Sequence, residues 1–304
     1  MSLEFKGINV GGYAGYELTS IITTNLKWWL DWGFLNNGAY GIHKYADPTS
    51  QLMLLHDNRY EDGRVWSGYG REWVWESGVV PASGMEAPFR VSGVYIDGTF
   101  YPKDTTGMFS HKIDYQNGRI IFNSPQTSGA DVRAEYCSRY ILVENADNPN
   151  CRQLMSWIDE DFTERQNPSS NTLKDLQVWL PAVFIDVGAT RQRGLQLGGG
   201  QIKTISIILY VFADSINDRD LLKNWLDYQG RSAFYLADLN QIDFPLNAYG
   251  EIVDGATNFV ELAEDHPWKK IRLMDSSSSK VPALSNTLFR GKVIWSAEVD
   301  FGGI

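Results

Sequence analysis

The sequence predicts an α+β protein, with a mostly β N-terminal region followed by a C-terminal α/β domain of sheet and helices. Alternating apolar residues across 91–143 favour strands in the first part, and two long apolar strands are expected within 178–212 of the second. The chain of 304 residues fits two domains. We expect a helix-plus-β domain over residues 1–145 and a second, α+β domain over 146–304.

A helix is predicted over residues 17–36, because Leu18, Ile22 and Leu26 recur at helical spacing. Residues 36–90 are rich in glycine, asparagine and aspartate, so little regular structure is expected there. One exception is the alternating segment 71–76, which reads as a strand that places Glu72 and Glu76 on one face.

The clearest β signal is Asn117-Gly118 between the alternating segments 111–115 and 119–122. An Asn-Gly pair between strands predicts a hairpin with a type I′ turn, since both central residues of that turn need a positive φ. Residues 132–143 also alternate, and they predict one long strand.

The second part alternates between strand and helix patterns. The expected strands cover residues 178–187, 202–212, 232–236, 259–262, 271–274 and 288–299, the expected helices cover 151–164 and 216–229, and the expected loops cover 165–172, 188–200 and 276–279. Both faces of 202–212 are apolar, so this strand is expected to be central and covered on both sides. Asn217 or Asp218 is expected to cap the helix at 216–229, and Gly230 to end it.

Composition argues against several classes of function. The net charge is -10, which disfavours sequence-specific nucleic-acid binding because a phosphate backbone selects basic surfaces. No apolar run reaches the length of a membrane span, and the N-terminus lacks the pattern of a signal peptide, so we expect no membrane association. Cys137 and Cys151 fit no metal-binding spacing; free thiols are favoured over a disulfide.

No motif predicts catalysis, a cofactor or a metal site. The run 198–204 is rich in glycine, but Lys203 does not follow the last glycine directly as a phosphate loop requires. Glu72 and Glu76 are the main carboxylates for a glycan hydrolase, although surface charge explains them as well. A calcium loop within residues 40–64 is a minor alternative to ordinary turn chemistry. We therefore expect a protein that is not an enzyme.

Eleven tryptophans are a clear excess, and Trp66, Trp73 and Trp75 lie close together in the sequence. Aromatic residues dominate both cores and protein interfaces. The three rings could form an aromatic core, a contact surface for another protein, or an exposed platform on which sugars stack.

Two parts of the chain resemble virion proteins of tailed bacteriophages. Residues 57–76, 91–101 and 113–122 resemble uncharacterised virion proteins of contractile-tailed phages. The strand–loop–strand–helix order of residues 180–187, 194–200, 202–212 and 218–229 resembles phage tail-terminator and neck proteins. The resemblance implies a sheet packed on helices and a ring, usually sixfold, that caps the tail tube or joins it to the head.

The resemblance implies two kinds of partner: further copies of this chain in a ring, with a hexamer as one expected form, and neighbouring neck or tail proteins. It also implies a place in a virion that is assembled in the bacterial cytoplasm. Subunit contacts are expected from the loop residues Arg191, Gln192, Arg193 and Gln196. The alternative is a receptor- or glycan-binding accessory of the tail or baseplate, with Trp66, Trp73 and Trp75 exposed.

Overall fold

The computed structural model describes most of the chain: residues 15–82, 84–156, 179–194, 201–239, 241–242, 245–253, 258–282 and 288–300. Strand accounts for 39% of the structure and helix for 23%, and the main sheet is curled. The prediction of a mixed α+β protein is therefore confirmed, with strand as the larger component.

The helical elements are α1 (Gly15–Asn36), η1 (Pro48–Ser50), η2 (Gly107–Phe109), α2 (Pro149–Met155), α4 (Ile216–Tyr228), η3 (Gln229–Arg231) and α5 (Phe259–Asp265). The strands before α2 are β1 (Tyr40–His43), β2 (Met53–Leu54), β3 (Val65–Ser67), β4 (Gly93–Ile96), β5 (Thr99–Pro102), β6 (His111–Asp114), β7 (Arg119–Phe122), β8 (Val132–Ala134), β9 (Tyr136–Arg139) and β10 (Leu142–Asn145). The strands after α2 are β11 (Ala182–Gly194), β12 (Gln201–Ala213), β13 (Ala233–Ala237), β14 (Pro267–Val281) and β15 (Phe289–Asp300).

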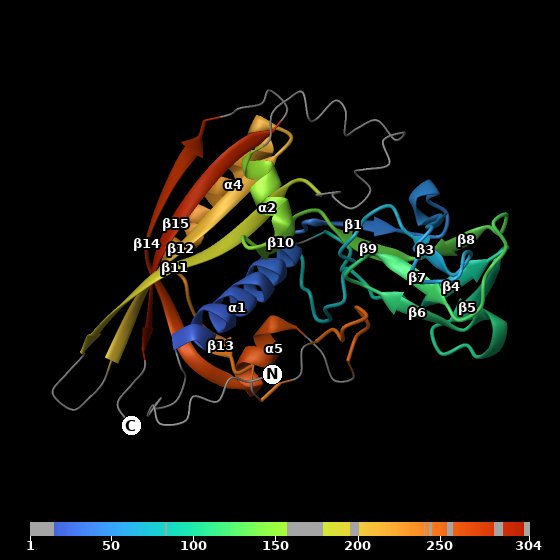
Figure 1. Cartoon of the computed structure of the whole chain (residues 1–304), viewed down its shortest axis with the longest axis horizontal. Helices are drawn as coiled ribbons and strands as arrows, with labels where there is room; N and C mark the ends of the chain where they lie inside the picture. Colours follow the sequence, from blue (N-terminus) through green and yellow to red (C-terminus); the bar gives the residue numbers. More distant parts are fainter. Residues whose placement is uncertain are drawn as a thin grey trace.

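A six-stranded sheet of order β10-β11-β12-β15-β14-β13 forms one half of the molecule (Figure 1). All of its pairs are antiparallel except β10 with β11. Helix α1 contacts both β11 and β13, which lie near opposite ends of this order. The sheet must therefore curl, and it wraps around the helix.

Helix α1 forms where the sequence predicts it, because its apolar side chains at helical spacing face one core. Leu18, Ile22 and Leu26 are at most 1% exposed, and they pack with residues of α4 and of the six-stranded sheet such as Leu226 and Ile207. The contacts of α1 thus cross the expected domain boundary at residue 145, and the N-terminal helix belongs to the core of the C-terminal sheet.

Small sheets form the other half, at the right of Figure 1: β2-β3-β7-β6 with four strands and β5-β4-β8 with three. The single long strand expected at 132–143 is wrong. The segment forms β8, β9 and β10, and each pairs in a different sheet. Val132 packs in the core of the small sheets and Val143 in that of the large sheet, so the chain passes from one core to the other. The expected alternation is not kept on the way, because residues 136–139 are all buried and Tyr140 is exposed.

Two local predictions in the small sheets need correction. Residues 71–76 are not a strand: Glu72 has a φ of 53°, and only Trp73 forms an isolated bridge, to Ser138. The hairpin of β6 and β7 is confirmed, but its loop spans residues 115–118, and Gly118 is the loop residue with a positive φ. The expected type I′ turn is therefore wrong.

Pairing between long strands overrides polar sequence in the second half. Residues 188–194 extend β11 and residues 276–279 lie within β14, although both were expected to be loops. Residues 259–262, expected as a strand, begin the helix α5, whose N-cap Asn258 accepts a hydrogen bond from the Glu261 amide. Residues 157–178 and 195–200 lie outside the described residues. The end of the expected helix at 151–164, the whole expected loop at 165–172 and the end of the expected loop at 188–200 fall there.

Strand β12 lies between β11 and β15, as its apolar pattern predicts. The two faces of β12 are buried to different extents: Ile207 and Leu209 on one face are fully buried, while Ile208 and Tyr210 on the other are half-buried. Helix α4 is capped by Ser215, which accepts a hydrogen bond from the Asp218 amide, and not by Asn217 or Asp218. Gly230 lies in the 3-10 turn η3 instead of ending the helix as a left-handed residue.

Gly118 offers a test of how tightly the 115–118 loop packs. A Cβ at Gly118 would lie 2.2 Å from the carbonyl oxygen of Gly70, whereas a Cβ at Gly107 would meet no atom within 4 Å. Both glycines have a positive φ. We expect Gly107→Ala to cost about 1 kcal/mol of unfolding free energy, from backbone strain alone. Gly118→Ala should cost roughly 3 kcal/mol or more, because strain and overlap add. Equal losses in denaturant unfolding would contradict this packing.

Candidate functional site

The three tryptophans singled out in the sequence are core residues. Trp66, Trp73 and Trp75 are 3%, 0% and 6% exposed and belong to the core of the small sheets. Trp73 stacks on Tyr136 with ring centroids 4.4 Å apart, and its Nε1 donates to the carbonyl oxygen of Gly70. None of these rings presents an open face on which a sugar could stack.

The expected contact loop is largely a strand. Arg191, Gln192 and Arg193 lie in β11, where their backbones pair with residues 202–204 of β12. Arg191 is exposed. Gln196 lies outside the described residues. These positions form the far part of the β11–β12 hairpin, and they are separate from the pocket described next.

A pocket of about 90 Å³ lies where the two halves of the molecule meet. Its lining comes from the 71–72 segment, the 115–118 loop, the end of β9, β10, the start of α2 and Trp179. The lining residues are Arg71, Glu72, Gln116, Asn117, Arg139, Ile141, Leu142, Glu144, Asn150 and Trp179. Of these, sequence reasoning singled out only Glu72, since the rest come from segments that no local pattern connects.

Glu72 is held in the pocket by its backbone. Its amide donates to the carbonyl oxygen of Gln116 (3.3 Å), and its carbonyl oxygen accepts from the amide of Arg139 (3.1 Å). Its φ of 53° is uncommon for a residue with a side chain. Such backbone strain persists only where the surroundings enforce it, and it is concentrated at functional sites.

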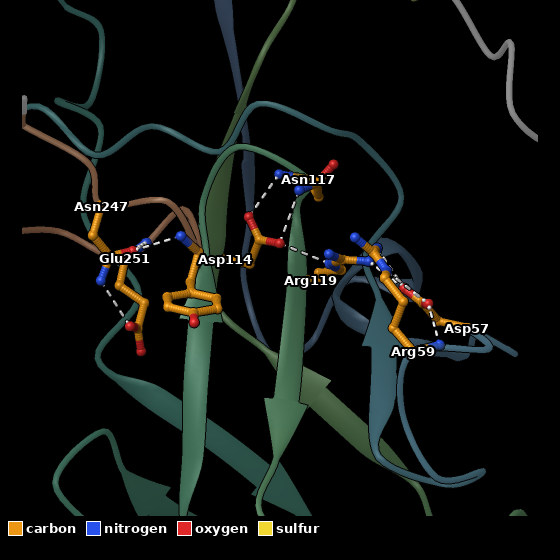
Figure 2. Close-up of polar contacts among 8 residues, drawn as sticks. Asp57, Arg59, Asp114, Asn117, Arg119, Asn247 and Glu251 are labelled. Carbon is orange, nitrogen blue, oxygen red and sulfur yellow. Dashed lines mark hydrogen bonds and ion pairs between the residues drawn. The ribbon is translucent and has the colours of Figure 1, made fainter. Parts of the chain in front are cut away.

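Asp114 fixes the loop that carries Gln116 and Asn117. Figure 2 shows Asp114 accepting hydrogen bonds from the amide and the Nδ2 of Asn117, at 3.1 and 2.9 Å, and from Nε of Arg119 at 2.7 Å. Arg119 also pairs with Asp57 at 3.0 Å, and Arg59 binds the same carboxylate at 2.7 Å. Two cationic partners hold the pKa of Asp57 well below its usual range, with the hydrogen bond from Arg59 as the main cause. The same two contacts occupy Asp57, which argues against the calcium alternative.

Arg139 is the buried cation of the pocket, with 4% of its side chain exposed. Its Nη2 donates to both oxygens of Glu76, at 2.6 and 2.7 Å, while its Nη1 lies 3.9 Å from Asp31. Burial works to lower the pKa of Arg139, but Glu76 and Asp31 outweigh it and raise the pKa. Its Nε and Nη1 atoms are buried, and no described residue accepts a hydrogen bond from them.

The lining of the pocket carries two carboxylates, Glu72 and Glu144, and two guanidinium groups, Arg71 and Arg139. Burial raises the pKa of Glu72 to about 6, although Lys27 and Arg139 act to lower it. Burial also raises the pKa of Glu144. The ammonium group of Lys27 donates a hydrogen bond to the carbonyl oxygen of Val143. Its ion-pair partner among the described residues is Asp31, at 3.8 Å. Thus two carboxylates of the lining face the pocket without a close cationic partner among the described residues.

The arrangement suits binding more than the expected hydrolase pair. Glu76 does not line the pocket; it is 4% exposed and fully engaged with Arg139. Glu72 and Glu76 therefore do not face a common space, as two glycosidase carboxylates must. The pocket instead combines free acceptors on Glu72, free donors on Arg139 and the ring of Trp179.

Several other features bear on function. Cys137 and Cys151 are both free and buried. Across the described part of the chain, no cluster of three or more histidine, cysteine or acidic side chains is arranged to hold a metal ion. No described helix is both long and apolar enough to cross a membrane. No protein-family model and no curated protein sequence matches this chain.

Matched substitutions at Glu72 and Glu76 should have opposite effects on stability. The folded-state pKa of Glu72 is about 6, above its ordinary value of 4.5, so wild-type stability falls as pH rises through this window. Glu72→Gln mimics the protonated form and should stabilise the protein by about 1–2 kcal/mol near pH 7.5, with a smaller gain near pH 5.

Glu76→Gln should instead cost roughly 3–5 kcal/mol, because it leaves the buried Arg139 without its hydrogen-bonded counter-charge. Denaturant unfolding of both variants at the two pH values measures the difference. A loss of stability in Glu72→Gln as large as that in Glu76→Gln would show that Glu72 is a paired structural anion.

Proposed function

We propose that this chain is a structural subunit of a tailed-phage particle, at the neck or tail end, that assembles with its own copies into a ring. The observation that carries the proposal is that, within the described residues, the six-stranded sheet has an open backbone edge on each side. An unpaired edge of a long strand is a template for pairing with another chain.

The first open edge is on β11. Its neighbour β10 pairs only with Ala182–Ile185, and the last contact on that side joins the Ala146 amide to the Ile185 carbonyl oxygen. Beyond this point, no described strand lies on the outer side of residues 186–194. A register shift between Val187 and Thr190 marks a bulge, which bends this edge away from the body of the sheet.

The second open edge is on β14, at the other side of the sheet. Strand β13 pairs with β14 only as far as Arg272, and Ser276 contacts Asp227 at the end of α4. The following residues 277–280 are exposed, and no described strand pairs with their outer side. The sheet thus ends in two different open edges, in Figure 1 at opposite ends of the long strands.

Two different edges that complement each other give a head-to-tail contact, and such contacts close into a ring when the rotation between subunits allows it. A C2 dimer would instead use one edge twice. The resemblance to tail-terminator and neck proteins points to the same kind of assembly. We infer that the β11 edge of one copy, including Arg191 and Arg193, pairs with the β14 edge of the next.

The alternative of a glycan-binding accessory loses its main support, because Trp66, Trp73 and Trp75 are buried. The absence of an enzyme activity stays a prediction. Neighbouring neck or tail proteins are the further partners that this role implies.

Ser278 tests the edge contact directly. The amide of Ser276 donates to the side chain of Asp275 and not to β15. Amides of a strand point to the same side at every second residue, so the Ser278 amide also points away from β15, toward the open edge. Native mass spectrometry across a concentration series should show a closed oligomer for the wild type and for Ser278→Ala, which keeps the amide. Ser278→Pro removes the donor and should shift the oligomer to monomer, with a thermal midpoint of the monomer close to that of Ser278→Ala.

Two outcomes would overturn the proposal. One is a wild-type chain that stays monomeric at every concentration. The other is a Ser278→Pro variant that assembles as well as Ser278→Ala does. Lys103→Glu, an exposed charge reversal in the small-sheet half, should leave assembly unchanged and serves as the control for surface substitution.

A further inference from the structure

The pocket between the two halves carries unfilled groups of both charges, and this is independent of the ring proposal. On the acceptor side, the carboxylate of Glu72 makes no hydrogen bond or ion pair within the described residues, although the side chain lies among buried charges. Glu144 accepts a hydrogen bond from Asn148 but has no cationic partner within ion-pair distance in the described chain. Both carboxylates therefore have room for a cationic donor.

On the donor side, Arg139 lines the same pocket, and its Nε and Nη1 atoms make no hydrogen bond within the described residues, although Nη1 lies 3.9 Å from Asp31. A buried donor without an acceptor costs free energy, and such groups are rare in folded proteins. Arg71 is exposed at the pocket and adds a second guanidinium. An acceptor such as a carboxylate would satisfy these cations with charge-assisted hydrogen bonds.

The remaining wall is mixed: Gln116, Asn117 and Asn150 contribute polar side chains, and the rest of it is apolar. Ile141 and Leu142 line it, and so does Trp179, whose ring meets the ring of Tyr69 edge-on at 5.8 Å between centroids. The volume of about 90 Å³ would hold several waters, and hence a small organic molecule. The pocket therefore brings two carboxylates, two guanidinium groups and apolar side chains together in one small lining.

We propose that this pocket binds a free α-amino acid with an aliphatic side chain. Its ammonium group binds Glu72 and Glu144, its carboxylate binds Arg139 and Arg71, and its side chain packs on Trp179, Ile141 and Leu142. No covalent step is involved. The backbone of Glu72, strained and bonded at both ends, holds the carboxylate in place before the ligand arrives, which lowers the cost of binding.

Other ligand classes fit less well. An anion alone would be repelled by Glu72 and Glu144, and a cation alone would leave the Arg139 donors unpaired and add to their charge. A neutral sugar would form hydrogen bonds with the polar lining residues, but it would leave the carboxylates of Glu72 and Glu144 without a counter-charge. An amino acid carries one charge of each sign on two groups bonded to the same carbon, so it can pair with the carboxylates and with the guanidinium groups at once.

Titration calorimetry on the full chain tests the proposal with three matched probes. L-valine has both charged groups, isobutylamine lacks the carboxylate, and isovalerate lacks the ammonium group. We expect L-valine to bind and each analogue to bind about 10- to 100-fold more weakly, as the loss of a charge-assisted hydrogen-bonded pair predicts. The affinity for L-valine should rise between about pH 5 and pH 7.5, because the ammonium group needs an ionised Glu72.

Two variants separate binding from folding. Glu72→Gln is expected to stay folded and to weaken L-valine binding by about 10-fold or more. Glu61→Gln removes an exposed glutamate elsewhere and should bind like the wild type. The proposal is overturned if none of the aliphatic amino acids binds the wild type, if isobutylamine or isovalerate binds as well as L-valine, or if Glu72→Gln binds unchanged. Failure of the ring proposal alone would produce none of these results, so the two proposals fail separately.

Discussion

A permanent positive charge, buried where the two halves of the molecule meet, constrains everything around it. The Arg139 guanidinium cannot lose its proton, so the fold has to supply acceptors for it. Glu76 supplies one by accepting two hydrogen bonds, and Asp31 of α1 lies 3.9 Å away. Because β9, the 71–76 segment and α1 contribute to one charge cluster, each of these elements has little freedom to move alone. The positive φ of Glu72 belongs to the same arrangement, since the amide of Arg139 donates a hydrogen bond to the carbonyl oxygen of Glu72.

The continuity of residues 132–145 explains how two cores fit one chain. Strand β8 lies in a small sheet, β9 pairs with β1, and β10 joins the large sheet. The breaks between them turn the chain, and the alternation of buried residues is lost at 136–139, which are all buried. The same stretch therefore packs Tyr136 in one core and Val143 in the other. The pocket lies beside this passage, and it draws its walls from both halves.

Sequence patterns predicted the elements whose cause is local. Helix α1 and the β6–β7 hairpin follow from apolar spacing and from a turn dipeptide, and both are present. The failures share a different cause. Ser277–Ser279 form a strand because β15 runs alongside them, and residues 71–76 leave the strand conformation because Glu72 bonds two other segments. The pocket was not predictable for the same reason: Arg139, Glu144 and Trp179 are brought together only by the packing of the two halves.

Strand β10 belongs both to the proposed ligand pocket and to the sheet edge that is proposed to meet another subunit. This strand contributes Leu142 and Glu144 to the pocket, and it also covers the outer side of β11 as far as Ile185. The open edge of β11 begins where β10 ends. Strand β10 is held by its pairing with β11 and by the burial of Leu142 and Val143 in two cores, and its Glu144 lines the pocket. A ligand that binds Glu144 would stabilise the pairing of β10 with Ala182–Ile185 of β11. It would thereby set where on β11 the edge available to another subunit begins. Any effect of the ligand on assembly would then follow from linkage, and assembly would change the affinity of the pocket by the same factor.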